Sequence, residues 1–258
     1  MPKFLIRVYS WETPKVYFSE IVLAKGESVI VATDFCNELG IVEEAATENK
    51  EEAALKILRV ATSRDREVFS GYEKEGPQLM SVCREEAKKM NLEMKVVDAR
   101  VSLDGKQVIF VFTADGRIDF RELVKKLSKD LKKTIRMQQI GSRDEAKKLG
   151  GFGICGRTLC CVNSKGNIPS ISTDMARIQQ ISHRGAERIS GLCGRLMCCL
   201  AYETEQYKEM MAGMPEMYSV VNTKEGRGTV IEINAIEQKI KVKLEKGEYI
   251  TITKEDLK

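Results

Sequence analysis

The chain has 258 residues, of which 43% are hydrophobic and 31% charged, and a formal net charge of +4. This length and composition allow a sizeable buried core and exclude an intrinsically disordered chain. Arg7 interrupts the apolar stretch near the N-terminus, and no apolar run approaches membrane-spanning length. We therefore expect a cytoplasmic protein without a signal peptide and without membrane insertion.

The positive charge is concentrated in the middle of the chain. Residues 121–200 contain sixteen Lys and Arg against six Asp and Glu, a local balance of +10, so the remainder sums to about −6. This asymmetry predicts an acidic partner for the middle segment, and nucleic acid is the first to consider.

Residues 1–55 are predicted to form a small β module followed by an acidic linker, because short apolar strands alternate there with turn residues. Residues 56–141 alternate between strand and helix patterns in the order β-α-β-β-α-β, which predicts a central ferredoxin-like domain. Gly76-Pro77 is expected to break or kink the first helix, since proline lacks a backbone donor. The expected strands are 57–61, 93–103, 106–113 and 134–140, and the expected helices are 64–90 and 119–133.

The second of these helices has an apolar face opposite a basic one. The basic face is either an ordinary solvated surface or a candidate nucleic-acid contact, and both interpretations stay open. Phe110 and Phe112 share a face of the preceding strand, where aromatic side chains could stack on RNA bases, although burial in the core is favoured. The candidate nucleic-acid residues are Lys125, Lys126, Lys129, Lys132 and Lys133.

Residues 142–212 form a cysteine-rich extension, with helices expected from Ser142 to Leu149 and from Cys199 to about Met211. Residues 213–258 contain four short strands separated by turns, which predicts a small antiparallel β-barrel. The expected fold class is therefore α+β, with β modules flanking the ferredoxin-like unit.

A C-G-R-x-x-C-C unit occurs twice in the extension, thirty-eight positions apart. In a reducing compartment, clustered cysteines are typical of metal ligands, and thiolates select zinc or iron–sulfur clusters. The alternative is that these cysteines are small buried hydrophobic residues; Cys36 and Cys83, which lie apart, are assigned to the core in this way. The candidate ligands are Cys155, Cys160, Cys161, Cys193, Cys198 and Cys199.

Six thiolates are two more than one tetrahedral centre needs. They suit either one complete site with two spare cysteines, or two incomplete clusters that borrow a ligand from another chain. Gly156 and Gly194 let the backbone turn closely around a metal, and Arg157 and Arg195 could offset the charge of the thiolates.

The sequence offers little support for an enzyme. Residues 151–156 match the dinucleotide fingerprint G-x-G-x-x-G, but they follow a helix where a strand is required, so this motif is rejected. The single histidine, His183, lies beside Arg184 and is interpreted as an exposed bystander rather than a ligand. We expect a non-catalytic protein, since a redox enzyme that used a cluster would also need a substrate pocket.

The stretches F-T-A-D-G-R-I-D-F-R-E-L-V at 112–124 and I-G-S-R-D-E-A-K-K-L-G-G at 140–151, with both cysteine units, resemble the YaaT/RicT family. Its members carry the polymerase-suppressor C-terminal domain, and the resemblance covers about 56–202 most closely. All six repeat cysteines match the family motif.

The resemblance implies a cytosolic bacterial subunit that joins two small helical partners of the YlbF/YmcA type. It further implies 4Fe-4S clusters, as many as two, held partly by these cysteines and shared with partner chains. The implied complex is associated with messenger-RNA processing by endoribonuclease Y, and through it with developmental regulation. The alternative is a nucleic-acid-binding protein whose cysteines hold structural zinc or no metal.

Overall fold

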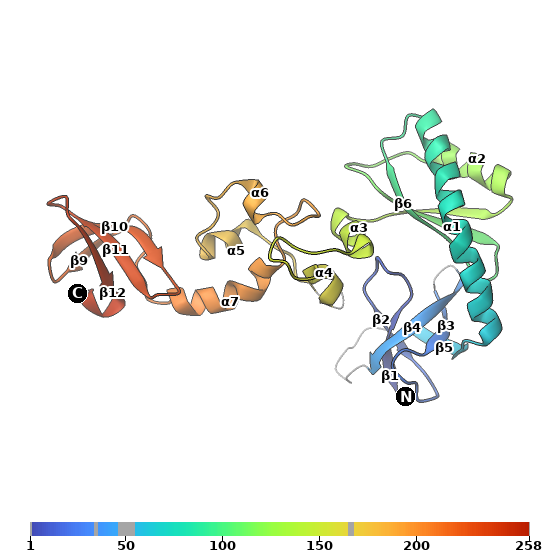
Figure 1. The fold of residues 1–258 in the computed structure, drawn as a ribbon, viewed down its shortest axis with the longest axis horizontal. Helices are drawn as coiled ribbons and strands as arrows, with labels where there is room; N and C mark the ends of the chain where they lie inside the picture. The colour runs from blue at the N-terminus through green and yellow to red at the C-terminus, as the bar shows by residue number, and fades with distance from the viewer. Residues whose placement is uncertain (1, 34–35, 46–54, 165–167, 258) are drawn as a thin grey trace. The chain divides into compact units, whose positions relative to one another are not determined.

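The fold combines helices with several small β-sheets (Figure 1). The structure is a computed structural model, and it describes residues 2–33, 36–45, 55–164 and 168–257. The chain divides into two compact units. Unit 1 comprises Met1–Asn167 and Leu192–Arg195, and unit 2 comprises Ile168–Gly191 and Leu196–Lys258. The mixed α+β class predicted from the sequence is confirmed.

Unit 1 begins with a closed barrel of five strands in the order β1-β2-β5-β3-β4. Alternate side chains of these strands point inward, and Ile6, Val29 and Val31 are almost completely buried in the barrel core. The strands are β1 (Lys3–Arg7), β2 (Lys15–Phe18), β3 (Ser28–Ala32), β4 (Asn37–Ala45) and β5 (Leu55–Val60).

The ferredoxin-like unit is not confirmed, because its expected first strand belongs to the barrel. β5 pairs in parallel with β2 and antiparallel with β3, so both of its edges are used in closing the barrel. Ile57 of β5 is buried among the barrel residues. The central sheet is left with three strands, in the order β6-β7-β8.

The central sheet lies beneath two helices. Strand β7 pairs antiparallel with β6 and parallel with β8, and Phe110 of β7 packs against Leu123 and Leu127 of the second helix. The sequence therefore predicted the order of these elements correctly, although not the membership of the sheet. They are α1 (Ser63–Lys89), β6 (Lys95–Val101), β7 (Gln107–Thr113), α2 (Arg121–Leu131) and β8 (Thr134–Gln139).

The opposite face of the central sheet is covered by the loop after β1. Tyr9 and Trp11 are stacked at 4.9 Å and pack against Ile109 and Val111 of β7. Since both faces of β7 are covered, its five central residues are all buried.

Helix α1 runs through Gly76-Pro77 without interruption, so a break at this point is wrong, and a kink, the other expected outcome, stays a prediction. Pro77 removes one helical hydrogen bond, but Leu79, Met80 and Cys83 continue to pack on the central core. The helix begins with a capping box between Thr62 and Asp65, the arrangement that satisfies exposed backbone donors.

Unit 2 contains short helices followed by a four-stranded antiparallel sheet in the order β12-β11-β10-β9. The predicted barrel is thus an open sheet among the described residues. The four-residue strand β9 meets the chain after β12 only through a bridge between Thr223 and Leu257. The elements are α5 (Thr173–Ile178), α6 (Ala186–Ile189), α7 (Cys199–Met211), β9 (Val220–Thr223), β10 (Gly226–Asn234), β11 (Lys239–Leu244) and β12 (Tyr249–Thr253).

Within the ranges that the structure describes, no helix combines the length and apolar character needed to cross a membrane.

Candidate functional site

The two cysteine units fold into the same hairpin. An isolated bridge joins Phe152 to Thr158 in the first unit, and the equivalent bridge joins Ser190 to Leu196 in the second. Just after each bridge, a second backbone hydrogen bond occurs at equivalent positions, from Leu159 N to Gly151 O (3.1 Å) and from Met197 N to Ile189 O (2.9 Å). The sequence repeat is therefore a structural repeat.

Each hairpin turns at the glycine that follows its first cysteine. Gly156 and Gly194 have φ angles of +75° and +72°, a left-handed conformation that costs other residue types free energy. Cys155 is exposed at one turn and Cys193 is half-buried at the other. The backbone therefore turns at both glycines, and the expectation that these turns enclose a metal stays a prediction.

The adjacent cysteines of each unit come at the start of a helix. Cys160 and Cys161 open α4 (Cys160–Asn163), whereas Cys198 caps α7 and Cys199 is its first residue. Cys161 is buried and Cys160 is half-buried, so the two neighbours differ in access. All eight cysteines are present as thiols.

Unit 1 brings one cysteine of the second hairpin close to the first. Burial raises the pKa of the Cys161 thiol, and the Cys193 and Cys160 thiols raise it further, while Arg143 acts in the opposite direction. Cys155, Cys160, Cys161 and Cys193 all belong to unit 1, and Cys198 and Cys199 belong to unit 2.

The donor chemistry of the hairpins fits a soft metal, because thiolates are the ligands that zinc and iron–sulfur clusters share. Among the described residues, no three Cys, His, Asp or Glu side chains are gathered in a metal-binding arrangement. The six cysteines therefore remain candidate ligands on the basis of their chemistry and their repeated fold.

The two repeat arginines differ in their surroundings. A Cβ atom added at Gly141 would lie 3.2 Å from Nη2 of Arg195, so this guanidinium rests on the backbone just before α3 (Ser142–Leu149). Arg157, at the equivalent position of the first hairpin, is exposed as Arg195 is, but its guanidinium does not make this contact at Gly141. The contact of Arg195 could not be predicted from the repeat, since the repeat makes the two arginines equivalent.

Comparison with known proteins identifies the family of this chain. The PSP1 C-terminal conserved region matches residues 55–140, and the third domain of PSP1-like proteins matches residues 170–214. The stage 0 sporulation protein YaaT of Bacillus subtilis is 42% identical over 189 residues, which cover 73% of this chain and 68% of that protein. The chain belongs to the YaaT/RicT family.

A more distant similarity links this YaaT/RicT family member to an uncharacterized protein of Schizosaccharomyces pombe. The two are 34% identical over 82 residues, which are 32% of this chain and 11% of the yeast protein. No solved structure matches the chain significantly.

The lysines of α2 in this YaaT/RicT family member are partly neutralised. Lys125 lies 2.8 Å from Glu122, and Lys126 lies 3.1 Å from Asp130. Lys133, beyond the helix end, lies 3.9 Å from Glu75 and its ammonium is 5.5 Å from the centre of the Tyr72 ring. Lys129 and Lys132 are exposed and have no ion pair to another described residue.

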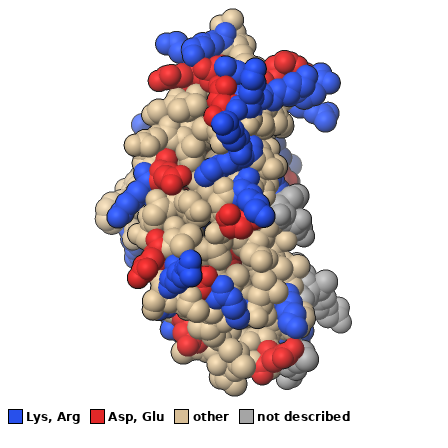
Figure 2. Space-filling model, turned by 90° about the vertical axis from the view of Figure 1, so that its right-hand side faces the viewer, with Lys and Arg blue, Asp and Glu red and all other residues tan. Residues whose placement is uncertain are grey.

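Figure 2 shows basic side chains gathered at the end of unit 1 where α1 ends and α2 lies, with acidic side chains between them. This surface of the YaaT/RicT family member is mixed in charge, which weakens its attraction for a polyanion. Phe110 and Phe112 are completely buried beneath α1 and α2, so the core assignment is confirmed and they cannot stack on bases.

Proposed function

We propose that the chain is a non-catalytic iron–sulfur subunit of a regulatory complex that steers messenger-RNA processing by endoribonuclease Y in the cytoplasm, and through it development. The observation that carries this proposal is the pair of hairpins with one fold, each presenting three cysteines. A repeated thiolate hairpin is more consistent with two metal half-sites than with cysteines that only fill a core.

In this proposal each hairpin contributes thiolates to a 4Fe-4S cluster, and a partner chain completes the ligand set. Two small helical proteins of the YlbF/YmcA type are the proposed partners, as the family resemblance implies. The relative in Bacillus subtilis is named as a stage 0 sporulation protein, and this supports a developmental role.

Anaerobic purification of the tagged chain from the cells that produce it tests the proposal. We expect iron, acid-labile sulfide, broad visible absorption and two small co-purified proteins. Deletion of the gene should increase the number of messenger RNAs that remain incompletely processed. A colourless preparation with stoichiometric zinc would contradict the cluster.

A nucleic-acid-binding protein with structural zinc is the second candidate. Lys129 and Lys132 favour it, because their charges have no carboxylate within ion-pair distance among the described residues. This alternative requires that the isolated chain bind RNA with an affinity that falls steeply with salt.

A further inference from the structure

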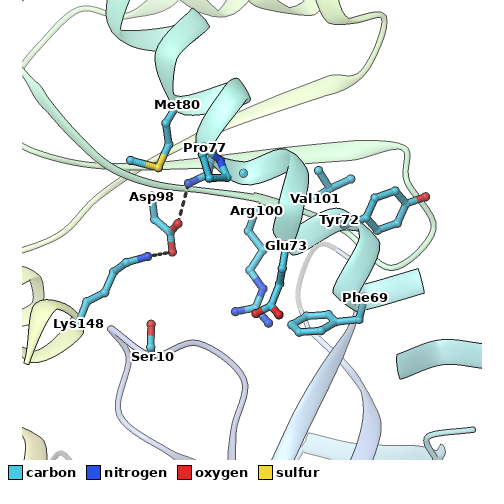
Figure 3. A pocket seen from close by; sticks show the side chains of 12 residues that line it. Ser10, Phe69, Tyr72, Glu73, Pro77, Met80, Asp98, Arg100, Val101 and Lys148 are labelled. Atoms are coloured by element: carbon cyan, nitrogen blue, oxygen red, sulfur yellow. Dashed lines mark hydrogen bonds and ion pairs between the residues drawn. The ribbon is translucent and has the colours of Figure 1, made fainter. Parts of the chain in front are cut away.

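Unit 1 contains a cavity of about 310 Å³ between helix α1 and strand β6, unrelated to the cysteine hairpins (Figure 3). The α1 side of the cavity is built at helical spacing by Phe69, Tyr72, Glu73, Pro77 and Met80. Small-molecule sites begin at about 300 Å³, so this volume suits a ligand of amino-acid size rather than a nucleotide.

The backbone around Gly76 shapes this cavity. A Cβ atom at Gly76 would lie 3.0 Å from the carbonyl oxygen of Ala99, so the absence of a side chain lets α1 approach β6 closely. Pro77 has no N–H, so the carbonyl of Glu73 lacks its usual helical donor.

Arg100 provides a preorganised positive charge on the β6 side. Its guanidinium carbon lies 4.5 Å from the centre of the Phe69 ring and 5.5 Å from that of Tyr9, so the group is held by cation–π contacts. Its Nε is buried out of reach of a ligand and has no hydrogen-bond partner among the described residues. Arg100 lines the cavity with the rest of its side chain, and a guanidinium is suited to binding a carboxylate.

Other charged groups around the cavity interact with partners inside the protein. Asp98 forms an ion pair with Lys148 and accepts a hydrogen bond from Ala99 N (2.9 Å), as Figure 3 shows. Glu38 also faces Arg100 from the barrel; burial raises the pKa of its carboxyl group and Arg100 lowers it, so Arg100 has this acidic neighbour inside the protein.

Glu73 is the remaining acidic group that lines the cavity. Its exposed carboxylate lies on the same side as the Arg100 guanidinium in Figure 3, without an ion pair to a described residue. The cavity therefore presents one positive and one negative group beside an apolar wall that includes Phe69, Tyr72, Met80 and Val101.

We propose that this cavity binds a free α-amino acid. Its carboxylate pairs with Arg100, its ammonium group pairs with the carboxylate of Glu73, and its apolar side chain lies against Phe69 and Tyr72. A simple anion would satisfy Arg100 but would be repelled by Glu73, whereas a zwitterion satisfies both groups.

Calorimetry on the full chain tests this site with L-phenylalanine as the first probe, followed by the other proteinogenic amino acids. We expect one or more apolar amino acids to bind. Removal of either charge from the probe should weaken binding roughly tenfold or more, since hydrogen bonds to charged groups are stronger than those between neutral groups. The matched probes are 3-phenylpropionate, which lacks the ammonium group, and phenethylamine, which lacks the carboxylate.

The variants Glu73→Gln and Arg100→Lys should weaken binding of the amino acid, while Glu67→Gln and Arg64→Gln, at exposed positions of α1, should not. Thermal unfolding of each variant checks that it folds, and the probe series on the unmodified chain does not depend on any variant. The proposal is overturned if no amino acid binds, if 3-phenylpropionate binds as tightly as L-phenylalanine, or if Glu73→Gln binds unchanged.

Discussion

Gly156 and Gly194 have the same left-handed backbone conformation at equivalent positions of the two hairpins, and a Cβ atom added at either would meet no atom within 4 Å. Substitution there changes backbone strain alone. We expect Gly156→Ala and Gly194→Ala each to destabilise its hairpin by about 1 kcal/mol.

Hydrogen exchange of the hairpin amides measures this effect, which should appear as faster exchange around the substituted turn. Gly71→Ala is the matched control, since Gly71 lies within α1 and an added Cβ atom also meets nothing there. The control should stabilise the helix by up to about 1 kcal/mol. If the amides of both hairpins exchange equally slowly in Gly156→Ala, Gly194→Ala and Gly71→Ala, the strain argument is contradicted.

Arg195 is expected to hold the turn of the second hairpin in place through its contact at Gly141. The variant Arg195→Ala removes this contact, so the half-buried thiol of Cys193 should react faster with a thiol reagent. Arg157→Ala makes the same change in the first hairpin, where the equally exposed arginine does not make the contact at Gly141. If the two variants alter the Cys193 rate equally, Arg195 has no positioning role.

The buried carboxyl group of Glu38 should make the stability of unit 1 depend on pH. Its pKa in the folded chain is raised, first because burial disfavours the ionised form, although Arg100 and hydrogen bonds from Cys36 and Tyr9 partly oppose this. Above its ordinary pKa the unfolded chain loses this proton before the folded chain does. Stability should therefore fall as pH rises from about 4.5 through the raised pKa.

The variant Glu38→Gln should flatten this part of the curve of unfolding free energy against pH. Asp104 and Cys36 also face Glu38, so the difference between the variant and the parent chain is the quantity to follow. Glu67→Gln, which removes an exposed carboxylate of α1, should leave the shape of the curve nearly unchanged. If the curves of unfolding free energy against pH for Glu38→Gln and for the parent chain are parallel, Glu38 is not the source of this pH dependence.

Lys129 of α2 and Lys132 just after it have no ion pair to another described residue, so they should make most of any RNA contact on that surface. If RNA binds there, the double variant Lys129→Gln/Lys132→Gln should reduce the slope of log affinity against log salt by about 1.4, because each contact to a single strand contributes about 0.7. Lys125→Gln, which removes a lysine already paired with Glu122, should change the slope much less. Filter binding at several salt concentrations provides the slopes.

Local periodicity predicted helices and strands well because it depends on residues close in sequence. The apolar residues of α2, including Leu123 and Leu127, are buried as their spacing required. The membership of β5 in the barrel could not be predicted in this way, since it depends on which distant edge Ile57 reaches. The packing of Trp11 on the central sheet was not predicted for the same reason. The uninterrupted apolar run of β7 was an available signal, because it implies that both faces of its sheet are covered.

The candidate site was predictable in its residues but not in its geometry. Repetition identified the six cysteines and the two left-handed glycines, because equivalent sequence produced equivalent hairpins. It did not predict that Cys193 lies near Cys161, or that Arg195 and Arg157 differ, since both depend on contacts outside the repeat.

In the proposed function, each hairpin is a half-site for its own cluster. Iron and acid-labile sulfide should be counted in the anaerobically purified complex after all three cysteines of one hairpin are replaced by serine. We predict that either triple variant loses about half of the iron and sulfide, and that Cys36→Ser, outside the repeat, loses none. Zinc in place of iron, or the loss of all the iron from either triple variant, would contradict two separate half-sites.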